Sequence, residues 1–180
     1  MNKFLLAVHV LAAIVAVGPV TVAASMFPPS ARKALAEPGD AQALSTVRVL
    51  HRICRLYATV GVAVPVFGFA TAKNMGVLGD TWLIASIALT ALAAVVLAAL
   101  VLPRQTALME GIEGMEGMEG MEESIEEGVG GGGRGAAYAG ASRVGPRDTA
   151  RLAMFTGLFN LLWATVTILM IVRPGSTTGA

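Results

Sequence analysis

The chain has 180 residues, of which 55% are hydrophobic and 14% are charged, and its formal net charge is +1. A soluble surface needs roughly a quarter of charged residues, so this composition excludes a soluble enzyme or a nucleic-acid-binding module and indicates a membrane protein. The single cysteine, Cys54, excludes an internal disulfide and a CxxC site.

Four apolar stretches predict four transmembrane helices. The first, residues 4–26, carries no charge and reaches about 34 Å as a helix, enough to cross the ~30 Å hydrocarbon core of a bilayer. The others are residues 53–72, 81–102 and 152–172. A cleaved signal peptide is the alternative for the first stretch, but the apolar run is longer than a usual signal core. The fold class predicted is an all-α, four-helix transmembrane bundle.

Prolines and caps predict the connections. Residues 27–40 contain Pro28-Pro29 and Pro38-Gly39 and are predicted to be a loop, with Asp40 as the N-cap of the next helix. That helix is predicted to run from 41 to about 72, with a kink at Pro65. Pro103 is predicted to end the third span.

The connection between the third and fourth spans, residues 104–147, is far longer than an ordinary loop. It contains a Met-Glu-Gly triplet repeat, eight glutamates between Glu110 and Glu127, and the glycine run Gly130–Gly133. Self-repulsion and lack of burial predict a disordered or loosely helical low-complexity segment.

The distribution of cations predicts the topology. The first and third connections carry most of them, whereas the opposite side has Lys3, Lys73 and Arg173. By the positive-inside rule, the long connections lie in the cytoplasm and both termini lie outside, in a plasma-membrane protein.

A basic collar marks the start of the second span. Arg48, Arg52 and Arg55 share one helical face, which suits the anionic headgroups of the lipid bilayer. Cys54 lies beside this collar, where a packed interfacial thiol is expected rather than a reactive one.

Polar residues inside the spans are expected to face other helices. Small or polar residues recur at helical spacing, in the fourth span as Gly157, Asn160, Ala164 and Thr167. Depth along the helices places Ser86 and Thr167 level with His9. It also places Asn160 level with Gly61, whose carbonyl Pro65 leaves free, so Asn160 is predicted to donate to that carbonyl.

His9 is the best single candidate for chemistry. A neutral imidazole ligates haem iron, copper or zinc and relays protons. The alternative is a buried histidine hydrogen-bonded to Ser86 or Thr167. Since His51 is expected near the opposite membrane face, a bis-histidine haem within one chain is excluded.

Three methionines of the repeat, Met115, Met118 and Met121, have thioether sulfurs that bind Cu(I). The same methionines also follow simply from expansion of a triplet repeat.

Three segments together resemble a bacterial family of predicted integral membrane proteins, the domain of unknown function 2269. They are KFLLAVHVLAAIVAVG at the start, TWLIAS in the third span and ILMIVRPG at the end. The family is distantly similar to CopD-type copper-resistance proteins and HemJ-type protoporphyrinogen oxidases. The resemblance to HemJ-type enzymes implies a ligand role for His9, but their later intramembrane lysine has no counterpart in spans two to four.

The sequence therefore predicts a multi-pass membrane protein that is a structural or partner-binding subunit rather than an enzyme. A haem- or copper-handling protein, with haem b or copper at His9, is the alternative. A small-molecule transporter acting as an oligomer is the third reading. The expected partners are the lipid bilayer and a second copy or another membrane protein, with no nucleic acid.

Overall fold

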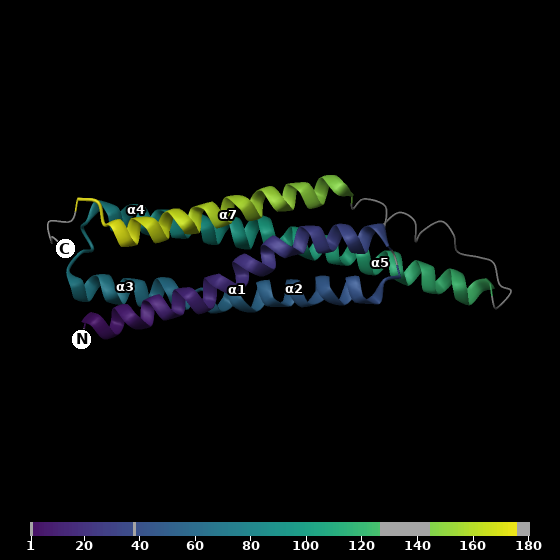
Figure 1. The fold of residues 1–180 in the computed structure, drawn as a ribbon, viewed down its shortest axis with the longest axis horizontal. Helices are drawn as coiled ribbons and strands as arrows, with labels where there is room; N and C mark the ends of the chain where they lie inside the picture. The colour runs from purple at the N-terminus through teal and green to yellow at the C-terminus, as the bar shows by residue number, and fades with distance from the viewer. Residues whose placement is uncertain (1, 38, 127–144, 176–180) are drawn as a thin grey trace.

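The computed structural model describes residues 2–37, 39–126 and 145–175, and these residues form helices and short turns with no strand among them. Four helical segments are long and apolar enough to cross a membrane: Phe4–Ala36, Ala41–Met75, Thr81–Met115 and Arg147–Val172. They lie along one long axis, with the described parts of both termini at the same end (Figure 1). The all-α, four-helix prediction is confirmed.

The first helix, α1, runs from Asn2 to Ala36 and contains Pro19, Pro28 and Pro29. The predicted loop at 27–40 is therefore wrong for most of its length. Proline cannot donate to the carbonyl four residues back, which weakens this turn. Burial compensates for that loss, because Phe27 and Ala31 are completely enclosed in the core.

The second membrane crossing is divided into α2, Ala41–Val60, and α3, Ala63–Met75. The break at 61–62 lies one turn before Pro65, as expected where a proline removes a donor. The Gly61 carbonyl accepts instead from the Val64 amide at 3.1 Å.

The third crossing consists of α4, Thr81–Val95, the π-helical segment η1, Val96–Val101, and α5, Leu102–Glu126. In η1 the Leu102 amide bonds to the Leu97 carbonyl, five residues back. This wider turn comes directly before Pro103, and the helix continues past the proline as α5. The prediction that Pro103 ends the third span is wrong, because α5 continues to Glu126 through the first part of the segment predicted to be disordered or loosely helical. Residues 127–144 lie outside the described residues.

The last helix, α7, runs from Pro146 to Val172. Gly145 is its N-cap, and the carboxylate of Asp148, three residues further on, accepts from the Gly145 amide at 3.0 Å, as in a capping box. The buried face of α7 carries Leu152, Thr156, Phe159 and Val166. The predicted stripe of Gly157, Ala164 and Thr167 is exposed, as are Ala91, Ala94 and Ala98 of the third crossing.

The main hydrophobic core lies in the half of the bundle remote from the termini. It extends from Val20 to Ala34 in α1 and from Ala43 to Cys54 in α2, and it includes Val101, Ile112 and Phe159 of the later helices. At the other end a small second cluster joins Ala72, Trp82 and Leu83 with Val77 and Met170. There α1 lies beside α3 and α4 beside α7, as two pairs (Figure 1).

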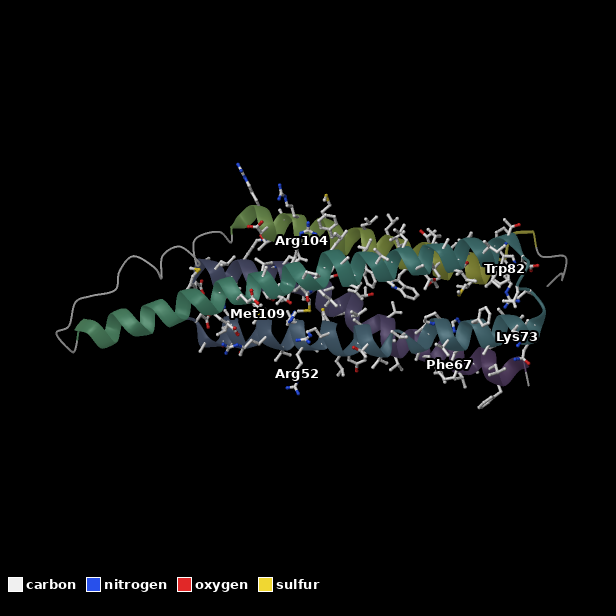
Figure 2. All side chains as sticks on the ribbon, turned by 180° about the vertical axis from the view of Figure 1, so that it is seen from behind. Arg52, Phe67, Lys73, Trp82, Arg104 and Met109 are labelled. Carbon is white, nitrogen blue, oxygen red and sulfur yellow. The ribbon has the colours of Figure 1, made fainter. Side chains whose placement is uncertain are left out.

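Charged and aromatic residues bracket a slab of bilayer thickness. Lys73 and Trp82 lie together at one end, and Arg52 and Arg104 lie nearer the other end (Figure 2). The 22 residues from Arg52 to Lys73 span about 31 Å as a helix, which matches the ~30 Å hydrocarbon core. The helices continue beyond Arg52 and Arg104. We call this continuation the extramembrane head: 28–36 of α1, 41–51 of α2, 104–126 of α5 and 146–151 of α7.

The predicted N-cap at Asp40 is confirmed. Its carboxylate accepts from the amides of Gln42 and Ala43 at 2.9 and 3.0 Å, and Lys33 Nζ lies 3.2 Å from it. The Ala43 amide, followed by Lys33, lowers the pKa of Asp40 below its ordinary value of 3.8. Because the folded-state pKa is depressed, the cap stabilises α2 at neutral pH and this contribution is lost as the pH falls through the lowered pKa.

Replacing Asp40 by alanine is expected to fray the first turn of α2. The amides of Gln42 and Ala43 lose their acceptor and should exchange with deuterium severalfold faster at pH 7. Asp40→Asn keeps an acceptor and should exchange more slowly than Asp40→Ala. Equal exchange in Asp40→Ala and the unmodified chain would show that the carboxylate does not hold this turn.

Candidate functional site

The best-connected polar group lies where the extramembrane head meets the slab. His51 and Cys54 of α2 face Gln105 of α5. The His51 Nδ1–H donates to Gln105 Oε1 at 3.2 Å, and Gln105 Nε2 donates to Cys54 Sγ at 3.5 Å. Gln105 and Cys54 are completely buried, and the Phe27 ring lies 6.3 Å from the His51 ring. We call His51, Cys54 and Gln105 the head-base network.

Within the head-base network, the polar groups bond to one another. Gln105 uses its oxygen for His51 and its nitrogen for Cys54, so it ties α2 to α5 at two points one helical turn apart. A buried amide satisfied in this way fixes the register of two helices, because any sliding leaves a polar group without a partner. The arrangement therefore has a structural role, which is to hold α2 and α5 in one register.

The arginines around this level have different surroundings. Arg48 Nε donates to Glu113 Oε1 of α5 at 2.8 Å, with both side chains about half exposed. The Arg104 guanidinium lies 4.2 Å from the centroid of the Phe155 ring. Arg52 and Arg55 are exposed, and Arg52 points away from the bundle (Figure 2). The headgroup collar thus stays a proposal for Arg52 and Arg55, while Arg48 pairs with a carboxylate of its own chain.

His9 packs at the crossing of α1 and α3 and is 8% exposed. Its Nδ1 lies 3.2 Å from the Val64 carbonyl oxygen, which can only accept, so Nδ1 carries the proton. Gly68 lies against the ring, since a Cβ on Gly68 would be 2.9 Å from His9 Cε1. A hydrogen bond from His9 to Ser86 or Thr167 was expected. The bond described for His9 goes instead to the backbone carbonyl of Val64 in α3.

The other predicted intramembrane contacts also differ. Ser86 and Thr167 donate to carbonyls of their own helices, at Trp82 and Trp163. Asn160 Nδ2 donates to Ser25 Oγ of α1 at 3.0 Å. The predicted bond from Asn160 to Gly61 is wrong, because Asn160 faces α1 and the Gly61 carbonyl already accepts from Val64.

The candidate metal ligands are not brought together in the part of the chain that the structure describes. His9 precedes Phe27, which packs on His51, by 18 residues of α1, or about 27 Å, so the two histidines lie far apart. Within the described ranges no group of three or more His, Cys, Asp or Glu side chains is placed to hold a metal. Met115 is partly buried, and the side chains of Met118 and Met121 lie outside what is described.

Sequence reasoning missed Gln105, Ser25 and the Val64 carbonyl. Gln105 falls in a predicted loop because Pro103 precedes it. A signal for its burial is that it is a lone glutamine with apolar Val101 and Leu108 at helical spacing on either side. A backbone acceptor such as the Val64 carbonyl has no side-chain signal at all.

Four apolar crossings, bracketed by interfacial tryptophan and arginine, define a multi-pass integral membrane protein. A model of the family described as predicted integral membrane protein (DUF2269) matches residues 3–123, about two thirds of the chain, and the chain belongs to this family. The match ends within α5 and does not include α7. No curated protein and no solved structure matches the chain significantly.

Proposed function

We propose that this protein is a non-enzymatic membrane subunit that binds a partner protein through its extramembrane head. The single observation that carries the proposal is the continuation of packed helices beyond the slab. Ala31, Ala34, Leu44, Met109 and Ile112 are buried there, among helix segments that a simple four-span anchor does not need. A packed helical surface outside the bilayer is a typical docking element.

The charges of the head suit a protein partner. Its described surface carries both cations and carboxylates: Arg32, Lys33, Arg48, Glu110 and Glu113 are all exposed. Figure 1 shows α5 extending past the ends of the other helices. A projecting helix with carboxylates of its own offers a surface for a complementary, basic segment.

We place the head in the cytoplasm and the protein in the plasma membrane. The head and its boundary carry most of the arginines of the chain, whereas Lys3, Lys73 and Arg173 lie toward the opposite end. The positive-inside rule supports this orientation, with both termini outside.

The orientation is tested with two cysteine variants in a Cys54→Ser background. Thr46 is exposed in the head and Thr81 is exposed at the other end of the bundle. In intact cells an impermeant maleimide is expected to label Thr81→Cys, and to label Thr46→Cys only after the cells are opened. The reverse pattern would overturn the orientation.

Partner binding is tested by site-specific photocrosslinking in native membranes. A photoreactive phenylalanine analogue replaces Glu110 or Glu113 in the head, with lipid-facing Ile87 of α4 as the matched control position. A discrete protein adduct is expected at the head positions and not at Ile87. Adducts absent from both head positions would contradict the proposal.

A second function, haem b handling at His9, is favoured by one observation. Because Nδ1 donates to Val64, the Nε2 lone pair is the one available for a metal. A copper centre has no such support, because within the described ranges no group of three or more His, Cys, Asp or Glu side chains is placed to hold a metal. For a haem with a single protein ligand, purified protein should show a Soret band that His9→Ala removes. A spectrum without this band, in cells supplied with haem, would exclude it.

A further inference from the structure

Two buried polar atoms on α7 have no hydrogen-bond partner. They are Thr156 Oγ1 and Asn160 Oδ1, one helical turn apart. Thr156 is 3% exposed. Buried polar side chains in proteins are nearly always hydrogen-bonded, so two such atoms on the same face of one helix require an explanation.

The other hydroxyls of the bundle show that Thr156 is exceptional. Helical threonines usually bond to the carbonyl four residues back. Those described here that do so are Thr46, Thr59, Thr71, Thr90, Thr106, Thr165 and Thr167. Thr156 makes no such bond to Leu152. The Thr156 hydroxyl therefore lacks the usual bond within its own helix, and its proton is available for a group outside that helix.

The orientation of the Asn160 amide is fixed by its neighbour. Ser25 Oγ donates to the Thr21 carbonyl at 2.7 Å, so toward Asn160 it serves as an acceptor. Asn160 must then present Nδ2 to Ser25 and Oδ1 to the interior. The unpartnered atom is thus an acceptor that lacks a donor.

Both atoms lie within the hydrocarbon slab. Arg151 and Arg173 bracket this crossing, so Asn160 lies about 3 Å and Thr156 about 9 Å from its midpoint. Headgroups cannot reach this depth, and an unsatisfied polar group in hydrocarbon is strongly unfavourable. A donor must therefore be held inside the protein.

We propose that Thr156 and Asn160, with Ser25 at its edge, form an intramembrane binding site for one water molecule between α7 and α1. The water donates a hydrogen bond to Asn160 Oδ1 and accepts a hydrogen bond from the Thr156 hydroxyl. Residues four apart on a helix have Cβ atoms about 5–6 Å apart, a separation that one bridging water spans. The site links the two helices and stands apart from the partner-binding surface of the head.

The test is water-edited solid-state NMR of the full chain in bilayers of deuterated lipid. Magnetisation from water is expected to reach Thr156 and the Asn160 side-chain amide severalfold faster than it reaches Thr165. Thr165 is the matched control, because it is a threonine of the same helix that bonds to its own carbonyl at Leu161.

Two variants complete the design. Thr156→Val is expected to slow transfer to the Asn160 amide severalfold, while Thr165→Val leaves it unchanged. Transfer to Thr156 and Asn160 that is as slow as transfer to Thr165 in the unmodified protein overturns the proposal. This result needs no variant, so it holds even if Thr156→Val fails to fold. If the rate of transfer from water to the Asn160 amide is unchanged in folded Thr156→Val, the bridging role of the hydroxyl is overturned.

Discussion

Replacing Gly68 by alanine is expected to destabilise the bundle by about 1–3 kcal/mol, the usual effect of forcing extra volume into a packed site. The added Cβ would lie 2.9 Å from His9 Cε1, closer than two carbon atoms can approach. The ring cannot move away freely, because its Nδ1–H bond holds it to the Val64 carbonyl. Thermal unfolding in detergent, followed by circular dichroism, measures the effect.

The control is the same substitution at Gly157, where nothing lies within 4 Å of an added Cβ. There alanine should be neutral or stabilising by up to about 1 kcal/mol, since it is the better helix former. In a His9→Ala background, Gly68→Ala should lose most of its penalty. If His9→Ala gives no relief, the two residues are not in contact.

Replacing Gln105 by alanine is expected to cost about 2–4 kcal/mol, through a cavity and two lost hydrogen bonds. Gln105 is completely buried, and its removal leaves both His51 and Cys54 without their partner across the α2–α5 contact. Local opening of that contact should raise the rate at which a maleimide labels Cys54 by about tenfold or more. Cys54 is the one cysteine of the chain, so the labelling reports this site alone.

Gln105→Met separates the two causes. Methionine keeps most of the volume but removes both hydrogen bonds, so a smaller loss than in Gln105→Ala is expected. Equal stability and equal labelling in Gln105→Met and the unmodified chain would show that packing, and not the hydrogen bonds, holds α2 to α5.

Pro28, Pro29 and Pro103 show where local rules were overridden. Each removes a helical hydrogen bond, so local rules predict that a helix ends there. The helices continue because the flanking side chains are buried: Phe27 and Ala31 around the first pair, and Val101 and Gln105 around Pro103. At Pro65 a kink was predicted, and the helix is interrupted at 61–62, where Val62, Val66 and Phe67 around the proline are exposed.

The sequence by itself determined the class and the crossings of this protein. Long uncharged runs can satisfy their backbone in hydrocarbon only as helices, so hydropathy and length were sufficient. The N-cap at Asp40 followed from a local rule of the same kind.

Only the tertiary structure decided which side chains meet. The face of α7 that packs inward carries Leu152, Thr156 and Phe159, about one residue's rotation from the stripe predicted from small residues. Helical periodicity gives the spacing of a face but not its rotation, which depends on the shapes of all neighbouring helices at once. For the same reason the partner of His9 proved to be a backbone carbonyl, a group present at every residue and marked by none.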